Sequence, residues 1–163
     1  MPERRVCVLD AGPIIHLDQL GQLLLLDSLG ELFVPESVAY EAEKHRPGVT
    51  AKLGAHVVEE ADLLSREMSE LIHRLNLHTG EIAALGWAEK FGADLFVSDD
   101  KAARTAAQLL GIESTGTLGV IVEAFKLGIC ARERAIELLK AIPFQTTLHV
   151  QGAVLLQSIE KLR

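Results

Sequence analysis

The sequence predicts an α/β fold with a central, mainly parallel sheet flanked by helices. Short apolar runs rich in strand-forming residues recur along the chain, and amphipathic stretches with helical spacing separate them. The apolar runs do not alternate with polar residues, which is typical of strands buried on both faces of a parallel sheet. Strands that alternate with helices in this way favour helical layers on both sides of one sheet.

Five segments have the composition of strands. Residues 6–9 form the first apolar run, which stops at Asp10 and is followed by a Gly-Pro pair that indicates a turn. Residues 95–97 form the clearest later run, and a Ser-Asp-Asp sequence closes it. The other expected strands are 32–34, 56–58 and 112–115. The first and fourth runs are therefore both predicted to end in acidic residues.

Helices are expected between these strands and after the last one. In residues 14–26 the apolar side chains from Ile14 to Leu24 recur at helical spacing. Thr79 is suited to cap a later helix, and Gly92 is suited to end it. The expected helices span residues 14–26, 35–45, 62–77, 82–91, 101–110, 118–127, 133–140 and 154–162, with 144–150 extended.

Composition and charge limit the function classes. A length of 163 residues fits one domain, 1–163, with a sizeable core. The net charge of -7 argues against a protein that holds nucleic acid by bulk positive charge, whereas a divalent-cation site needs local negative charge. The two cysteines form no CxxC pair, which excludes a zinc site of that type. No apolar stretch is long enough to cross a membrane, so a cytoplasmic location is expected.

Acidic residues follow two of the predicted strands. Asp10 follows the first, and Asp99 and Asp100 follow the fourth. Parallel strands end at one edge of the sheet, where ligands bind in open α/β folds, so these acids are expected to lie close together. Two carboxylates about 4 Å apart repel by roughly 4 kcal/mol at an effective dielectric of about 20. A divalent cation reverses the sign of that energy, and Mg²⁺ and Mn²⁺ prefer oxygen ligands.

Glu41 and Glu81 are candidates to join this acidic cluster. Glu81 lies in the first turn of a predicted helix, and the apolar residues after it indicate a turn that packs inward. Glu41 lies close to the face of Val38 on the helix that Pro35 starts. Plainer interpretations stay open. Glu81 can be a simple charge at a helix N-terminus, Glu41 a solvated side chain, and Asp100 the N-cap of the next helix.

Four segments in this order resemble the PIN-domain family. They are VLDAGPIIHL at 8–17, VPESVAYE at 34–41, TGEIAAL at 79–85 and ADLFVSDDKAAR at 93–104. A fifth segment, GTLGVI at 116–121, is similar to the loop and helix that follow in a prokaryotic, toxin-like branch of the family. No single motif is specific, but the ordered set is, and it covers roughly residues 6–130.

The resemblance implies a PIN-like three-layer fold with an acidic pocket for Mg²⁺ or Mn²⁺. It also implies hydrolysis of phosphodiester bonds, usually in RNA, by a metal-activated water. Carried over position by position, the catalytic acids are Asp10, Glu41, Glu81 and Asp99. The metal ligands are Asp10, Glu81, Asp99 and Asp100, with either of the last two as the direct ligand. Many relatives are toxins of toxin–antitoxin pairs and form homodimers. An antitoxin is therefore a candidate partner beside the RNA substrate, and a homodimer is the expected assembly.

Ser98, Lys101 and Arg104 are weaker candidates for contact with substrate phosphates. The plainer interpretations are a small residue at a strand end and a solvated first turn of a helix. The six histidines are scattered and show no metal-ligand spacing, so surface or packing roles are expected for most. Residues from about 131 to 163 form a C-terminal extension that the resemblance does not cover, with dimerisation or a lid as candidate roles.

One departure from the family motivates an alternative function. Many relatives carry hydroxyl residues directly after the first aspartate, where this chain has Ala11 and Gly12. The alternative is a catalytically inactive PIN-like module that binds RNA or a protein partner, although the retained acids favour the nuclease. A receiver-like domain is disfavoured because no lysine follows the strand predicted at 112–115. A haloacid-type phosphatase is disfavoured because Asp10 has no second aspartate two positions later.

Overall fold

The computed structural model describes residues 3–163, which contain a five-stranded sheet. The strands are β1 (Val6–Leu9), β2 (Glu31–Pro35), β3 (Ala55–Val58), β4 (Leu95–Val97) and β5 (Glu113–Thr115). They lie in the order β3-β2-β1-β4-β5, and every pairing is parallel. The predicted α/β class and parallel sheet are confirmed. The carboxyl ends of all five strands therefore share one edge of the sheet.

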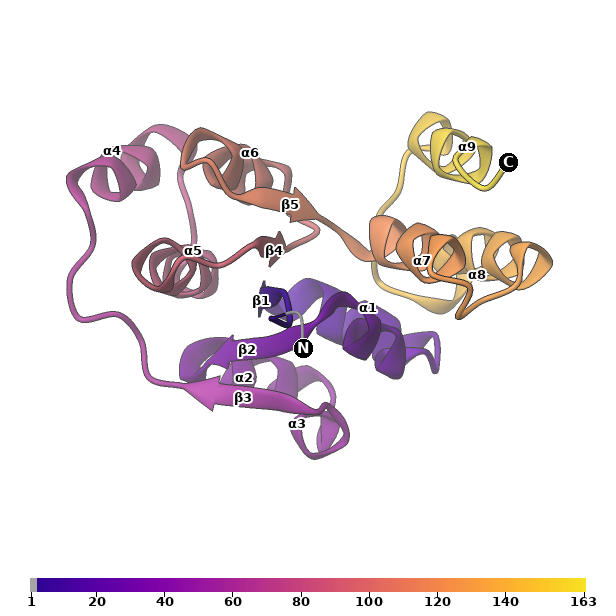
Figure 1. Cartoon of the computed structure of the whole chain (residues 1–163), viewed down its shortest axis with the longest axis horizontal. Coiled ribbons are helices and arrows are strands. Elements are labelled where there is room, and N and C mark those ends of the chain that lie inside the picture. The colour runs from indigo at the N-terminus through magenta and orange to yellow at the C-terminus, as the bar shows by residue number, and fades with distance from the viewer. Residues whose placement is uncertain (1–2) are drawn as a thin grey trace.

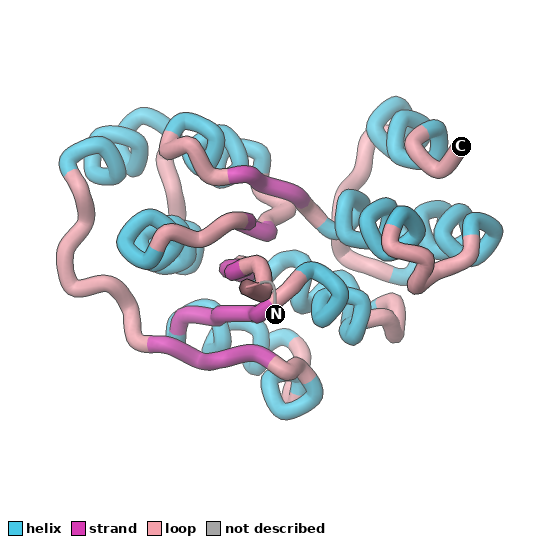
Figure 2. The backbone as a smooth tube through the Cα atoms, in the orientation of Figure 1, coloured by secondary structure: helices cyan, strands magenta, loops and turns pink. Residues whose placement is uncertain are grey.

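Helices cover both faces of the sheet. They are α1 (Ala11–Gln19), the 3₁₀ helix η1 (Leu23–Leu29), α2 (Glu36–His45), α3 (Val49–Lys52), α4 (Arg66–Leu75), α5 (Thr79–Phe91), α6 (Lys101–Leu109), α7 (Thr117–Lys126), α8 (Arg132–Gln145) and α9 (Gly152–Glu160). Figure 1 shows α5 on one side of the sheet and α1 and α7 on the other, with α8 and α9 beyond α7. The alternation of strand and helix along the chain is visible in Figure 2. The result is the expected three-layer arrangement.

The two central strands form the middle of the core. Residues Val8, Leu9, Phe96 and Val97 of β1 and β4 are completely buried. Leu85 of α5 is completely buried as well. Each large apolar side chain buried in this way stabilises the fold by about 1.5–3 kcal/mol. The uninterrupted apolar runs therefore form the two central strands of a sheet that is covered on both faces. The buried side chains of these strands fix the position of their carboxyl ends.

The first helix differs from its prediction at both ends. The expected Gly-Pro turn is wrong, because Asp10 caps α1 and the Gly-Pro pair lies in its first turn. The helix does not continue to residue 26, because Gly21 has a φ of +67° and η1 follows it. Leu24 is consequently 66% exposed instead of lying on a buried face.

Local capping also shifts the later helices. The helix expected from residue 62 begins only at Arg66, because the Ser65 hydroxyl accepts a hydrogen bond from the Met68 N–H. Residue His78, and not Thr79, precedes the first turn of α5. The short helix α3 was not predicted.

The C-terminal extension forms two helices and no strand between them. Phe144 belongs to α8, so the extended segment predicted from residue 144 is wrong at its start. Across residues 3–163 the segment between α8 and α9 pairs with no strand. The Arg132 guanidinium Nε donates to the Leu162 carbonyl at 2.7 Å and joins the start of α8 to the end of α9. No helix in the part of the chain that the structure describes is long and apolar enough to cross a membrane.

Candidate active site

A pocket of about 290 Å³ lies at the carboxyl edge of the sheet, beside the ends of β1 and β4. Its lining contains all five acids singled out from the sequence: Asp10, Glu41, Glu81, Asp99 and Asp100. The remaining lining residues are Ala11, Gly12, His78 and Gly80. The structure therefore brings together carboxylates from four separate parts of the chain. This cavity is called the acidic pocket below.

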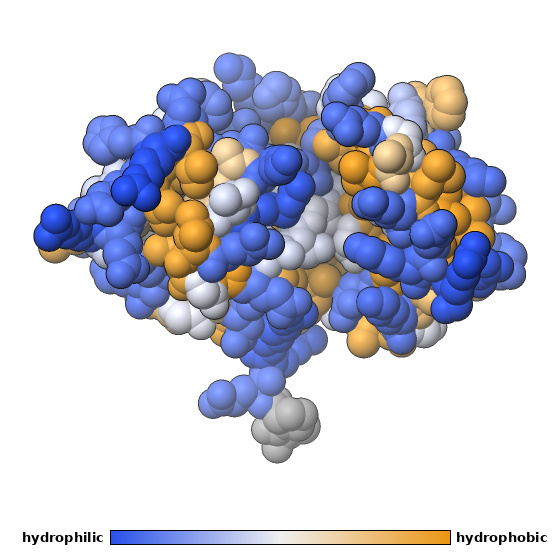
Figure 3. Space-filling view, turned by 90° about the horizontal axis from the view of Figure 1, so that it is seen from above, coloured by the Kyte–Doolittle hydropathy of each residue, from blue (hydrophilic) through white to orange (hydrophobic). Residues whose placement is uncertain are grey.

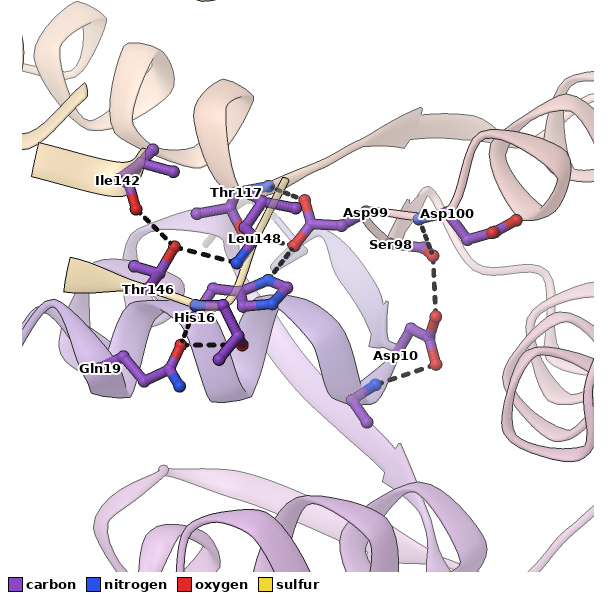
Figure 4. Close-up of polar contacts among 12 residues, drawn as sticks. Asp10, His16, Gln19, Ser98, Asp99, Asp100, Thr117, Ile142, Thr146 and Leu148 are labelled. Atoms are coloured by element: carbon purple, nitrogen blue, oxygen red, sulfur yellow. Dashed lines mark hydrogen bonds and ion pairs between the residues drawn. The ribbon is translucent and has the colours of Figure 1, made fainter. Parts of the chain in front are cut away.

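Asp10 is the most buried acid of the pocket, at 8% exposed. One carboxylate oxygen accepts from the Ala11 N–H at 2.9 Å, and the other accepts from the Ser98 hydroxyl at 2.8 Å (Figure 4). Burial raises the pKa of Asp10 from 3.8 to about 6, although these two hydrogen bonds act in the opposite direction. The charges of Glu81 and Glu41 raise the pKa further. Asp10 is thus held in a place that disfavours its own ionised form.

Ser98 connects Asp10 to the acids at the end of β4. Its side chain is completely buried, and its oxygen donates to Asp10 and accepts from the Asp100 N–H at 3.1 Å. The Arg104 guanidinium donates to the Ser98 carbonyl at 2.9 Å. Of the three residues proposed from the sequence for substrate contact, Ser98 is therefore enclosed by protein partners. Lys101 is exposed and does not line the acidic pocket.

Glu81 and Glu41 reach the pocket from two different helices. Glu81 lies in the first turn of α5 and accepts from the His78 N–H at 2.8 Å. Burial raises the pKa of Glu81, and the charges of Asp100 and Glu41 add to that rise against the opposing effect of His78. The carboxylates of Asp10, Glu41, Glu81 and Asp100 are therefore close enough for each to be affected by the charge of another.

Gly80 allows two of these carboxylates to converge. A Cβ atom at this position would lie 3.0 Å from Glu41 Oε2 and 3.8 Å from Asp10 Oδ1. The first distance is tighter than an ordinary contact, so a side chain here would shift the Glu41 carboxylate by a few tenths of an ångström. The absence of a side chain at Gly80 thus lets the Asp10 carboxylate at the end of β1 and the Glu41 carboxylate of α2 approach each other beside the start of α5.

Asp99 is oriented differently from the other acids. Its Oδ1 accepts from the Thr117 N–H at 2.7 Å, and its Oδ2 accepts from the Thr117 hydroxyl at 2.6 Å. His16 Nδ1 lies 2.7 Å from the same Oδ2. Figure 4 shows the Asp99 carboxylate turned toward His16 and Thr117 and away from Asp10. Gly116 is required for this contact, because a Cβ there would lie 2.7 Å from Asp99 Oδ1.

Asp100 caps α6 and also faces the acidic pocket. Its Oδ1 accepts from the Ala103 N–H at 2.8 Å, as the N-cap interpretation of the sequence proposed. Its charge raises the pKa of Glu81, which shows that it acts on the pocket as well. A helix cap and a pocket acid are therefore combined in one residue.

The donor set of the pocket fits a divalent cation in its chemistry. Within residues 3–163 no three His, Cys, Asp or Glu side chains already surround one point as ligands. The five acids among the lining residues supply carboxylate oxygens, which Mg²⁺ and Mn²⁺ prefer as ligands. Two of them converge over the bare backbone of Gly80, and burial with like charge disfavours the ionised form of Asp10. A cation would offset that repulsion.

Sequence reasoning missed four residues that shape this site: His16, Thr117, His78 and Gly80. The histidines were expected to serve the surface or packing, and nothing in their spacing pointed to Asp99. Thr117 carried a usable signal, because it follows β5 and so lies at the same edge as the acids.

Comparison with known proteins agrees with this geometry. A family model described as a PIN domain matches residues 6–163, and so includes the C-terminal extension. No curated protein matches the chain. The parallel sheet, the flanking helices and the acidic edge are consistent with that match. The chain belongs to the PIN-domain family, whose members are generally nucleases that use divalent metal ions.

Proposed function

We propose that this protein is a divalent-metal-dependent endoribonuclease. The observation that carries the proposal is the position of Asp10, which is buried beside the charges of Glu81 and Glu41 with its pKa raised to about 6. Stability alone does not favour such an arrangement, because each ionised neighbour increases the cost of ionising Asp10. A site that binds a cation gives it a reason, and Mg²⁺ or Mn²⁺ suits the oxygen donors.

The acids would share the work in the following way. Asp10, Glu41, Glu81 and Asp100 would hold the ion, because their charges act on one another inside the pocket. When bound, such an ion supplies a water of lowered pKa and positive charge beside the phosphate. Asp99 would position the end of β4, since its oxygens already accept hydrogen bonds from Thr117.

Ser98 and Arg104 would support the acids from behind. The Ser98 hydroxyl fixes the rotation of the Asp10 carboxylate, and Arg104 holds the Ser98 carbonyl. Side chains locked in this way keep a site preorganised and avoid rearrangement during the reaction. Many relatives carry hydroxyls after the first aspartate. Their counterpart here would be Ser98, which follows β4, the neighbour of β1 in the sheet, and donates a hydrogen bond to Asp10.

RNA as substrate, a role as a toxin and a homodimeric assembly belong to the same proposal. They follow from the sequence resemblance to the toxin-like branch, which also makes an antitoxin protein a candidate partner in the cytoplasm. Two-fold homo-oligomers are the commonest closed assemblies of such chains. The cleavage test below compares RNA with DNA, whereas the toxin role and the homodimer each need an experiment of their own.

The test is cleavage of a structured RNA, with DNA of the same sequence beside it, in Mn²⁺ or in EDTA. We expect wild-type protein to cut RNA internally only with Mn²⁺. Asp10→Asn and Glu81→Gln should each lower the rate at least about a hundredfold, the scale on which loss of a group around a bound metal is felt. Glu133→Gln, an exposed acid on α8, is the matched control and should cleave normally.

Two results would contradict the proposal. Cleavage that survives in EDTA or in both pocket variants would show that the acidic pocket is not the active site. No cleavage of either nucleic acid combined with no Mn²⁺ binding would instead support an inactive PIN-like module that binds a partner.

A further inference from the structure

A second cleft adjoins the acidic pocket and shares Asp99 with it. Its volume is about 380 Å³. One wall comes from α6 and β5, with Arg104, Gln108 and Ser114, and the other comes from the C-terminal extension. In Figure 1, α9 lies opposite β5 and α6. The cleft therefore lies next to the acidic pocket, and Asp99 belongs to the lining of both.

The wall from the extension is one face of α9. Gln151, Val154, Ser158 and Lys161 line the cleft at intervals of three or four positions, which is the spacing of a single helical face. The loop before α9 adds His149. Figure 3 looks onto this side of the molecule and shows a hollow between two parts, with hydrophilic side chains along its rims. The last helix is thus placed to contact whatever occupies the cleft.

The charge of the cleft is opposite to that of the acidic pocket. Arg104 and Lys161 are the cations of its lining, and Asp99 is its sole acid. The Asp99 carboxylate already accepts hydrogen bonds from Thr117, so it is well satisfied by protein donors. Among residues 3–163 neither cation forms an ion pair with a carboxylate within 4 Å. In a chain of net charge -7, this is a local cationic surface.

We infer that this cleft binds the phosphodiester backbone of a single-stranded nucleic acid on its way into the acidic pocket. The inference rests on the proposed function, because it assigns the path of that enzyme's substrate. Phosphates are attracted by cations and by polar donors such as Gln108 and Gln151, which carry no base information. The aliphatic side chain of Val154 offers an apolar surface for a base. A cleft of this volume suits a short piece of one strand and not the side of a rigid duplex.

The C-terminal extension gains a role from this inference. Its last helix would hold the strand while the acids at the end of β1 and β4 act on it. Arg104 would join the two functions, because it lines the cleft and also donates to the Ser98 carbonyl behind Asp10. Lys161 is the cleaner probe, since its side chain is exposed and no hydrogen bond ties it to the acidic pocket within the described residues.

The experiment measures binding without cleavage. A labelled single-stranded RNA of about ten nucleotides, within the range that such clefts engage, is titrated in EDTA against wild type, Lys161→Gln and Lys140→Gln at several salt concentrations. Lys140 is an exposed lysine of the same extension, on α8, that does not line the cleft. We expect Lys161→Gln to weaken binding about threefold at low salt. It should also reduce the slope of log K against log salt by about 0.7, the value for one phosphate contact on a single strand. Lys140→Gln should change neither.

The outcomes separate this inference from the proposed function. Equal affinities and salt slopes for the two lysine variants would overturn the inference, even if wild type cleaves RNA with Mn²⁺. Absence of single-strand binding by wild type, or a preference for the duplex of the same sequence, would overturn it as well. Binding that depends on Lys161 in a protein that neither cuts nucleic acid nor binds Mn²⁺ would support single-strand binding by the cleft and refute the nuclease proposal.

Discussion

At the scale of single residues, burial and neighbouring negative charges make ionisation of an acid in the site unfavourable. Asp10 shows this most clearly, because its two hydrogen bonds from Ala11 and Ser98 do not offset the cost of burying its charge. Asp99, one position after Ser98, is satisfied instead by Thr117 and His16. Neighbouring acids of one strand end therefore have different environments and different expected tasks.

The first prediction concerns the stability of Asp10→Asn without metal. Asparagine cannot ionise, yet it can still accept from the Ala11 N–H and donate to Ser98. Because the folded pKa of Asp10 is raised from 3.8 to about 6, wild type loses stability as the pH rises between these values and the loss is complete above the upper one. Asp10→Asn should therefore be more stable than wild type by up to about 3 kcal/mol near pH 7.5.

Urea denaturation in EDTA at two pH values measures this difference. Near pH 3, where aspartate in either state is largely protonated, the two proteins should differ by less than about 1 kcal/mol. An Asp10→Asn variant that is less stable than wild type at both pH values would show that the Asp10 carboxylate stabilises the fold, contrary to the expected strain.

The second prediction separates Asp99 from Asp100. Thr117→Val removes the hydroxyl that donates to Asp99, so the free energy of unfolding should fall by about 1–3 kcal/mol. The cleavage rate should fall as well. The Mn²⁺ affinity should stay within about threefold of wild type, because Thr117→Val removes no residue that contacts the ion directly. Asp100→Asn should instead weaken Mn²⁺ binding. Thr117→Ser keeps the hydroxyl and serves as the control.

Calorimetric titration of Mn²⁺ into these variants decides between the two acids. If Thr117→Val lost Mn²⁺ affinity to the same extent as Asp100→Asn, Asp99 would belong to the ion's direct ligands, and the positioning role proposed for it would be wrong.

At the scale of elements, the start of α5 determines whether the acids can meet. Gly80 lies one position into this helix, and its missing side chain leaves room for Glu41 of α2 and Asp10 at the end of β1. Glu81, the next residue, accepts from the His78 N–H at the same helix end. A short stretch of backbone thus positions oxygens that come from three different elements.

The third prediction follows from that contact. Gly80→Ala should lower Mn²⁺ affinity, because the new Cβ would lie 3.0 Å from Glu41 Oε2. The helix itself gains by the change, since alanine is favoured over glycine in helices by about 1 kcal/mol. Metal binding and thermal stability should therefore move in opposite directions. Gly152→Ala, at the start of α9 with no atom within 4 Å of the new Cβ, is the matched control and should leave Mn²⁺ affinity unchanged.

Differential scanning calorimetry without metal and a Mn²⁺ titration of the same samples give both readouts. Unchanged Mn²⁺ affinity in Gly80→Ala would mean that Glu41 and Asp10 do not need to converge above this residue, and the arrangement of the pocket proposed here would be contradicted.

At the scale of the whole molecule, the sheet could be predicted because its signals are local. The apolar runs at β1 and β4 need burial on both faces, and parallel strands bring their ends to one edge, so Asp10 and Asp99 were expected together. The pairing of His16 with Asp99 could not be predicted, because it depends on which face of α1 lies against β4. No spacing in the sequence encodes a contact between residues so far apart.

Breaks in helices were the other limit on prediction. Leu24 fits the helical spacing of residues 14–26, but the left-handed backbone at Gly21 ends that helix and leaves Leu24 exposed. A glycine within a periodic apolar segment hardly disturbs the hydrophobic periodicity, yet it allows the backbone to adopt a left-handed conformation that ends a helix. The periodicity alone therefore does not reveal the break. The cleft wall formed by α9 was likewise unpredictable, since it depends on how the extension packs against α7.

The central claim is that the acidic pocket binds a divalent cation, and calorimetric titration of Mn²⁺ near neutral pH tests it most directly. Wild type and the Glu133→Gln control should bind Mn²⁺ with the same affinity. Asp10→Asn and Glu81→Gln should each bind at least about tenfold more weakly, because each loses a carboxylate of the pocket. Binding of equal strength in all four proteins, or no binding by wild type, would contradict the account.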